Sequence, residues 1–160
     1  MKKIIHLTDT HIGYRNMGER FLALLSNLVY TKEPAHNYIV VITGDLIEDA
    51  FDEKNFTEMQ SYIEQLKNRG YDVLVAPGNH DYGNGIYADA RFVDIFKQTY
   101  FGNADIEYPK VDIFSDIAFI GLDSMAVGFR AFDERLLAQG ELGDQQLLSL
   151  HNILNTKTEV

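Results

Sequence analysis

The sequence has no cysteine in its 160 residues, which excludes disulfides and thiolate metal ligands. Basic residues are also few: 14 lysines and arginines stand against 24 acids, for a formal net charge of −10. Broad contact with a nucleic-acid backbone needs clustered basic side chains, and the longest basic run is Lys2-Lys3, so the sequence argues against a nucleic-acid partner. No apolar run approaches a membrane span, and the one near the N-terminus is too soon interrupted by His6 and Asp9 for a signal peptide. We therefore expect a cytoplasmic protein with no membrane partner.

What the sequence does contain is ordinary for a globular protein, with 46% hydrophobic and 24% charged residues. The length suits one domain that can bury a core, and neither a repeat nor a linker divides it. We therefore predict a single domain over residues 1–160.

The first half of the chain alternates strand and helix patterns. Strands are predicted at Lys3–Leu7, Tyr38–Thr43 and Asp72–Ala76. Helices are predicted at Glu19–Tyr30 and around Phe56–Leu66, the second ending at Gly70. The first strand is expected to be buried, and the β-branched second strand to be covered on both faces. This order predicts parallel strands joined by crossover helices, and therefore an α/β fold.

The second half is less regular. A helix is predicted over Ala88–Tyr100 and a hairpin from Val111–Phe114 and Ile117–Leu122. Residues 124–143 form a connection of uncertain structure, after which Asp144 is expected to cap a last helix.

Three polar clusters directly follow the three early strands. They are Asp9-Thr10-His11, Gly44-Asp45 with Glu48 and Asp49 close behind, and Gly78-Asn79-His80-Asp81. Loops at the carboxyl ends of parallel strands meet at one edge of a sheet, so these clusters are expected to converge there. Carboxylate, imidazole and amide donors together favour Mn²⁺, Fe or Zn²⁺.

The spacing suggests how the donors would be used. Asp9 and His11, one residue apart in an extended segment, would point the same way and grip one ion. Asp45 has two oxygens and could bridge two ions, and Asn79 would supply a neutral oxygen to the second. Glycines at 44 and 78 would let the backbone turn sharply beside the ions. Each cluster alone is better explained as a polar turn. All three in order, each directly after a strand, favour a metal site.

The same three clusters resemble the signature motifs of the calcineurin-like metallophosphoesterases: Asp9-x-His11, Gly44-Asp45-x-x-Glu48 and Gly78-Asn79-His80-Asp81. The resemblance implies an α/β/β/α sandwich of two sheets flanked by helices. It implies that Asp9, His11 and Asp45 bind one metal and that Asp45 and Asn79 bind a second. By the same resemblance His80 is a catalytic residue that is not a ligand: it contacts the substrate phosphate together with Asn79 and protonates the leaving group.

The motifs look most like those of class III cyclic-nucleotide phosphodiesterases, through Leu-Thr-Asp-Thr-His and Ala-Pro-Gly-Asn-His-Asp. The implied function is hydrolysis of a phosphodiester or phosphomonoester by a hydroxide that bridges two divalent ions, with a small phosphate ester such as a nucleotide as substrate. Asp45 would hold both ions, and Glu48 or Asp81 would orient His80. The Asp9–Arg15 segment separately resembles the nuclease subunit of double-strand-break repair complexes, which gives a nuclease fragment as an alternative.

One departure from the family is that its three further histidines have no counterpart here. His6 is expected to be packed or to lie behind the ligands, His36 to be solvated, and His151 to be structural within the last helix. The chain is therefore expected to be truncated at the C-terminus, as a fragment, a natural truncation or a half-site completed by another chain. A truncated edge could also associate with itself. The alternative from another functional class is a metal-poor binding domain with impaired catalysis.

Overall fold

The computed structural model describes residues 2–28, 33–125 and 140–157. Its strands are β1 (Lys3–Thr8), β2 (Tyr38–Thr43), β3 (Asp72–Ala76), β4 (Lys110–Phe114) and β5 (Ile117–Gly121). Its α-helices are α1 (Met17–Leu28), α2 (Glu53–Asn68), α3 (Arg91–Phe101) and α4 (Gly143–Lys157). Short 3-10 helices lie at η1 (Ala35–Asn37) and η2 (His80–Tyr82).

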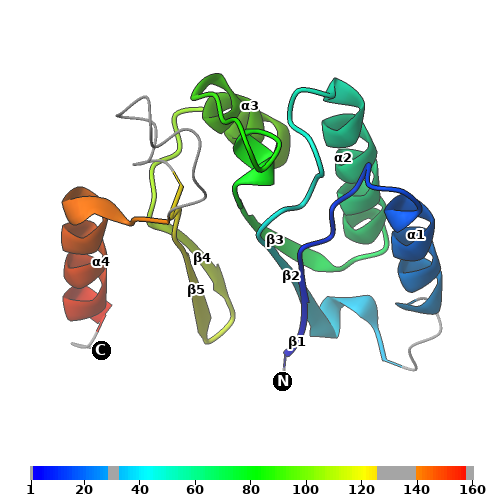
Figure 1. Cartoon of the computed structure of the whole chain (residues 1–160). Helices are drawn as coiled ribbons and strands as arrows, with labels where there is room; N and C mark the ends of the chain where they lie inside the picture. The colour runs from blue at the N-terminus through cyan, green and yellow to red at the C-terminus, as the bar shows by residue number, and fades with distance from the viewer. Residues whose placement is uncertain (1, 29–32, 126–139, 158–160) are drawn as a thin grey trace.

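The first three strands form a parallel sheet in the order β1-β2-β3, with Lys3 opposite Tyr38 and Ile39 opposite Asp72. The connection from β1 to β2 runs through α1, and that from β2 to β3 through α2 (Figure 1). The predicted parallel α/β topology is confirmed. All three strands therefore end at the same edge of the sheet, where the polar clusters begin.

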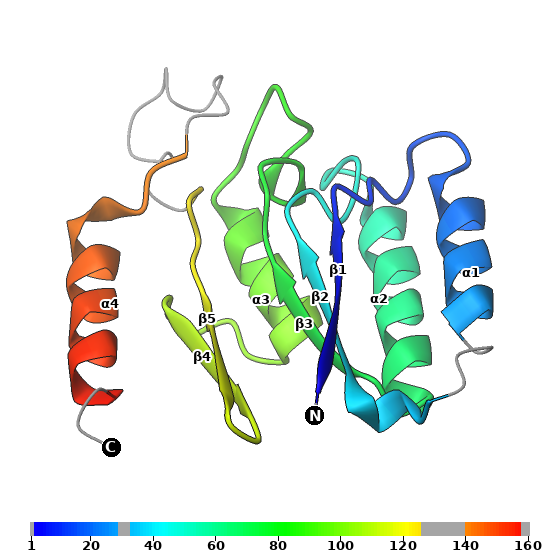
Figure 2. The same ribbon diagram turned by 90° about the horizontal axis from the view of Figure 1, so that it is seen from below.

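A second sheet and a last helix lie on the side of the parallel sheet away from α1 and α2. β4 and β5 pair antiparallel, with Lys110 opposite Gly121, and form the predicted hairpin. Figures 1 and 2 both place α1 and α2 beyond the parallel sheet on one side, and the hairpin followed by α4 on the other. This sequence of layers agrees with the predicted α/β/β/α sandwich.

The hydrophobic core lies between the parallel sheet and its helices, and it continues into the loops at the carboxyl edge. Ile39, Val40 and Ile42 of β2 are fully buried. So are three apolar residues that lie beyond the strands: Ile12, Leu46 and Ile47. Burying such a side chain contributes about 1.5–3 kcal/mol, so the loops that carry the polar clusters are held by the core itself.

The first strand differs from its prediction. Ile4 is 53% exposed, and within the described residues β1 is an edge strand that has β2 as its neighbour. Only Ile5 and Leu7 pack against the core, so the strand is covered on one face and is not buried. Association through this edge stays a prediction.

Some helix bounds also differ. α2 begins after Asp52, whose carboxylate accepts a hydrogen bond from the Lys54 N–H and caps the helix. α4 begins at Gly143, so Asp144 lies in its first turn and not before it. The helix predicted at Glu19–Tyr30 is observed as α1 over Met17–Leu28, and residues 29 and 30 lie outside the described residues. Most of the 124–143 connection also lies outside them. No helix in the described part of the chain is long and apolar enough to cross a membrane.

Candidate metal centre

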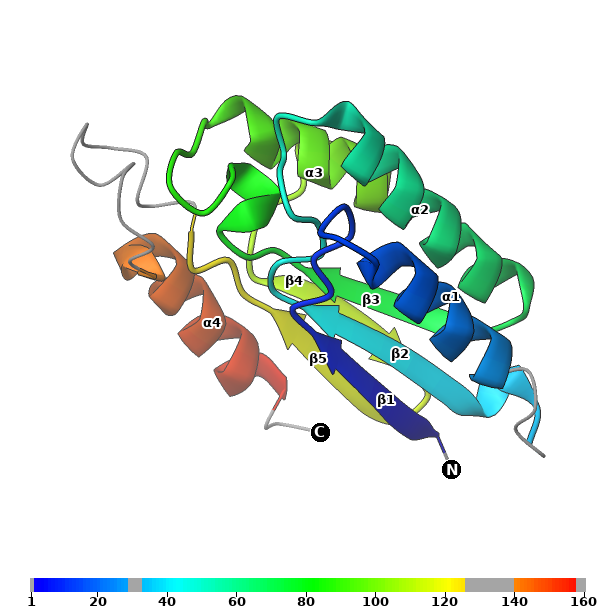
Figure 3. The ribbon, with the colours of Figure 1, turned by 45° about the vertical axis from the view of Figure 1, so that its right-hand side comes forward.

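The loops after β1 and β2 stay paired beyond the ends of the strands. The Asp9 N–H donates to the Gly44 carbonyl at 3.1 Å, and the His11 N–H donates to the Asp45 carbonyl at 3.0 Å. Ile12 then forms a parallel bridge with Ile47. Figure 3 shows these loops meeting the loop after β3 at one end of the sheet. The predicted convergence of the clusters is thus built by backbone hydrogen bonds.

Three of the predicted ligands have a left-handed backbone. The φ angles are 52° at Asp9, 41° at His11 and 43° at Asp45, a region that costs a non-glycine residue about 1–2 kcal/mol. The Asp9–His11 segment is therefore not extended, and the predicted reason for its side chains pointing together was wrong. Strain of this kind collects at functional sites. In this segment Thr10 donates to the Leu46 carbonyl at 2.8 Å and His11 Nδ1 lies 2.8 Å from Glu48 Oε2, so both side chains face the neighbouring loop.

The Asp9, His11 and Asp45 side chains come together. One donor atom from each lies within 4.8 Å of the other two, and His11 Nε2 is 3.9 Å from Asp45 Oδ2. In the described part of the chain, no lysine or arginine forms an ion pair with Asp9 or Asp45. Two carboxylates without a cationic partner, beside an imidazole nitrogen, fit a divalent cation.

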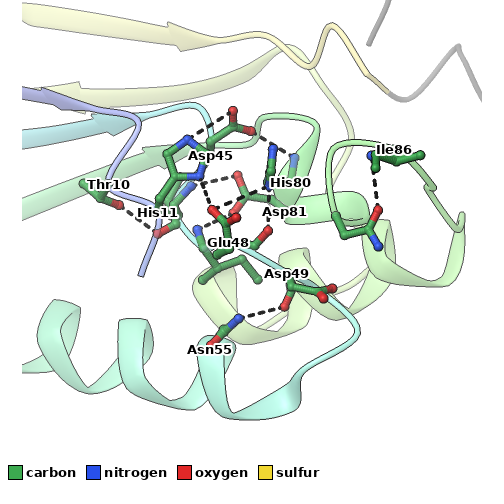
Figure 4. Close-up of polar contacts among 12 residues, drawn as sticks. Thr10, His11, Asp45, Glu48, Asp49, Asn55, His80, Asp81 and Ile86 are labelled. Atoms are coloured by element: carbon green, nitrogen blue, oxygen red, sulfur yellow. Dashed lines mark hydrogen bonds and ion pairs between the residues drawn. The ribbon is translucent and has the colours of Figure 1, made fainter. Parts of the chain in front are cut away.

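The loop after β3 brings Asn79 and His80 to the same place. The His80 N–H donates to Asp45 Oδ1 at 2.9 Å, which sets the start of η2 against Asp45 (Figure 4). Asn79 precedes it in the chain and is half-buried. The backbone therefore places Asn79 beside Asp45.

The His80 ring is held by main-chain groups. Its Nδ1 lies 2.6 Å from the Glu48 carbonyl oxygen, which can only accept, so Nδ1–H is the donor. Nε2 of a neutral ring then keeps its lone pair. Gly85 lies against that nitrogen: a Cβ at position 85 would be 2.4 Å from it. His80 also belongs, with His11 and Glu48, to a second group of potential ligands.

Asp81 does not orient His80. It is fully buried and accepts hydrogen bonds from the N–H groups of Leu46 (3.2 Å), Ile47 (3.2 Å) and Gly78 (2.8 Å). Burial raises the pKa of the Asp81 carboxyl to about 7, while the three N–H donors favour its charged form. Asp81 therefore joins the loop after β2 to the loop after β3.

The two glycines act differently from each other. Gly44 has φ +68°, so it makes the predicted sharp turn. Gly78 instead allows a close approach, because a Cβ there would lie 2.3 Å from the Asp45 backbone nitrogen and 2.4 Å from Asp45 Oδ1. At Gly78 glycine is therefore required by the tight packing of one loop on the other.

The remaining polar residues lie outside the donor group. Asp49 accepts from the Phe51 N–H at 2.9 Å in a local turn. His6 is exposed and bonds Thr43 at 2.8 Å, so it neither packs in the core nor lies behind the ligands. His36 is exposed, and His151 lies in α4, as predicted.

Comparison with known proteins agrees with this architecture. Residues 2–158 match the family model described as calcineurin-like phosphoesterase. Two relatives, each called an uncharacterized metallophosphoesterase, come from Helicobacter pylori strains 26695 and J99. Each is 31% identical over 103 residues, which cover 63% of this chain and 25% of the relative. The chain thus matches about a quarter of the length of these relatives.

The chain belongs to the calcineurin-like phosphoesterase family. Its members form a superfamily of phosphoester hydrolases that typically bind divalent metals. The family predicted from the sequence motifs is thus confirmed.

The left-handed backbone at Asp9 gives a first testable prediction. Asp9→Gly and Asp9→Ala both remove a donor, but only alanine keeps a Cβ at φ 52°, so the glycine variant should be about 1 kcal/mol more stable. Urea denaturation of metal-free protein measures this difference. Ser115 in the β4–β5 turn, at φ 58°, is the matched control: the same pair of substitutions there should differ similarly without changing metal affinity. Equal stability of the two Asp9 variants would contradict a strained site.

Proposed function

We propose that this protein hydrolyses phosphate esters at a divalent metal centre held by Asp9, His11, Asp45 and Asn79. The observation that carries the proposal is the group of Asp9, His11 and Asp45 donors within 4.8 Å of one another, formed by loops from two strands. A bound cation would offset negative charge on the phosphate and lower the pKa of an attacking water molecule. Imidazole and carboxylate donors favour Mn²⁺, Fe or Zn²⁺.

The chain's own residues supply the rest of the reaction. Asp45 holds its carboxylate toward both His11 and the His80 N–H, so it is placed between the two halves of the site. The His80 ring, held through Nδ1–H, would in its doubly protonated form give the Nε2 proton to the leaving oxygen. Asn79 would contact the phosphate beside it. A small phosphodiester or phosphomonoester, with nucleotides as candidates, fits a site on an acidic protein better than a nucleic acid does.

Metal stoichiometry gives the second prediction. Asp9, His11 and Asp45 provide three donors for one ion, whereas Asn79 and a share of Asp45 provide little for another. We expect calorimetric titration of the metal-free protein with Mn²⁺ to give one tight ion per chain and at most one much weaker one. Two tight ions would mean that further donors, such as Glu48 and His80, complete a second site.

Turnover decides between an enzyme and a binding domain. We expect Mn²⁺ to stimulate hydrolysis of bis(4-nitrophenyl) phosphate, and a chelator to abolish it. Tight Mn²⁺ binding without hydrolysis of diester or monoester substrates would instead favour a metal-binding domain without catalysis.

A further inference from the structure

Glu48 contacts both imidazoles of the site, but by different groups. Its carboxylate Oε2 lies 2.8 Å from His11 Nδ1 and 4.0 Å from His80 Nδ1. Its main-chain carbonyl lies 2.6 Å from His80 Nδ1. The two rings meet edge to face, with centroids 4.8 Å apart (Figure 4). The side chain of Glu48 therefore contacts the His11 ring, and its main-chain carbonyl contacts the His80 ring.

The contact with the carboxylate decides which nitrogen of His11 carries the proton. A carboxylate accepts, so Nδ1 of a neutral His11 carries the hydrogen and Nε2 keeps its lone pair. Nε2 is also the atom near Asp45 Oδ2, at 3.9 Å, on the side of the donor group. The ring is thus turned so that its free lone pair faces the other donors.

The backbone holds Glu48 in reach of His11. The Glu48 N–H donates to the Ile12 carbonyl at 2.9 Å, one residue beyond His11 in the neighbouring loop. Ile12 and Ile47 are fully buried on either side of this pairing, so the distance between the two loops is fixed by the core. The Glu48 side chain itself is 32% exposed, which leaves room to substitute it without opening the core.

We propose that Glu48 is a positioning residue for His11: its carboxylate holds the imidazole in the Nδ1–H tautomer, with Nε2 presented as a metal ligand. The inference rests on the metal centre proposed above. A carboxylate behind a ligating histidine raises its basicity and fixes its orientation, and loss of such a partner typically costs 10–100-fold in metal affinity. Any residue at position 48 would keep the carbonyl that holds His80.

Side-chain length makes the proposal specific for glutamate. Aspartate is shorter by one methylene, about 1.5 Å. In Glu48→Asp the carboxylate would fall short of His11 Nδ1. Glu48→Gln keeps the length and an accepting oxygen but loses the charge. Comparison of Glu48→Asp, Glu48→Gln and Glu48→Ala therefore separates the effect of side-chain length from the effect of the negative charge.

The test measures Mn²⁺ affinity by calorimetry, and kcat for bis(4-nitrophenyl) phosphate at saturating Mn²⁺. We expect Glu48→Ala and Glu48→Asp to weaken Mn²⁺ binding about 10–100-fold, and Glu48→Gln to weaken it less than either. Mn²⁺ affinity should fall more than kcat at saturating Mn²⁺, because the main-chain contact to His80 is retained. Glu64→Gln, which removes a surface charge paired with Lys67 on α2, is the control and should change neither quantity.

The tautomer of His11 is measured separately, by ¹⁵N NMR of the metal-free protein. We expect the Nδ1–H form in the wild type and in Glu48→Gln, and a mixture of tautomers in Glu48→Ala. An Nε2–H form in the wild type, or lower kcat with unchanged Mn²⁺ affinity in Glu48→Ala, would overturn the proposal. If the wild type bound no Mn²⁺, the proposed function would fail, and the tautomer would still decide whether Glu48 positions His11.

Discussion

Asp45→Asn is expected to reduce Mn²⁺-dependent phosphodiester hydrolysis by about 10³-fold or more while leaving the protein folded. Asparagine matches aspartate in size, tolerates the left-handed backbone at φ 43°, and can still accept the His80 N–H bond at 2.9 Å. It lacks the negative charge that faces His11 Nε2 at 3.9 Å. The substitution thus removes the charge at the centre of the donor group and little else. Rates with bis(4-nitrophenyl) phosphate, and thermal unfolding for integrity, measure the two effects.

The matched control is Asp49→Asn, in the same loop. Asp49 accepts the Phe51 N–H in a local turn that asparagine also forms, so the rate of Asp49→Asn should stay near that of the wild type.

A contrasting variant is His80→Ala, which should lower kcat yet leave Mn²⁺ affinity nearly intact, because His80 is assigned as a non-ligand. Loss of Mn²⁺ in His80→Ala would instead place His80 among the ligands, in the group it forms with His11 and Glu48.

The fold could be predicted where local pattern determines structure. The β-branched run Tyr38–Thr43 and the short run Asp72–Ala76 are observed as strands with the predicted bounds. Strand–helix alternation then required parallel pairing, and parallel pairing placed the three clusters at one edge. The exposure of Ile4 could not be predicted in this way, because the apolar run around it does not say which neighbours a strand will have.

The site could be predicted by residue type but not by geometry. Asp9, His11 and Asp45 were found from their positions after strands, yet nothing in their spacing indicates φ angles of 41–52°. The contact between Glu48 and His11 depends on how two loops 37 residues apart are paired, and so on the backbone bonds beyond the strand ends. The contacts of Asp81 with backbone N–H groups did have a sequence signal. An acid directly follows Asn79-His80, in a loop whose buried amides need acceptors.

That acid, Asp81, gives the prediction with the largest effect on stability. Asp81→Ala leaves the N–H groups of Leu46, Ile47 and Gly78 without their acceptor; Leu46 and Ile47 are fully buried and Gly78 is half-buried. Each unpaired buried group costs about 1–3 kcal/mol, so the loss of the acceptor for all three should lower the free energy of unfolding by roughly 3–9 kcal/mol. Domains of this size are stable by only about 5–15 kcal/mol, so much of the stability would be lost.

Asp81→Asn and a surface aspartate test whether the amides are the cause. Asparagine keeps one acceptor but turns an NH₂ group toward backbone N–H donors, so its loss should lie between those of the wild type and Asp81→Ala. Asp89 also accepts a backbone N–H, from Arg91 at 3.0 Å, but its side chain is 46% exposed, so Asp89→Ala should cost no more than about 1 kcal/mol. Urea denaturation of metal-free protein measures the stability of all three variants.

Because Asp81 joins the loop that carries Asp45 to the loop that carries His80, Asp81→Asn should also weaken Mn²⁺ binding if it folds. An Asp81→Ala protein as stable as Asp89→Ala would show that the loops are held by other contacts.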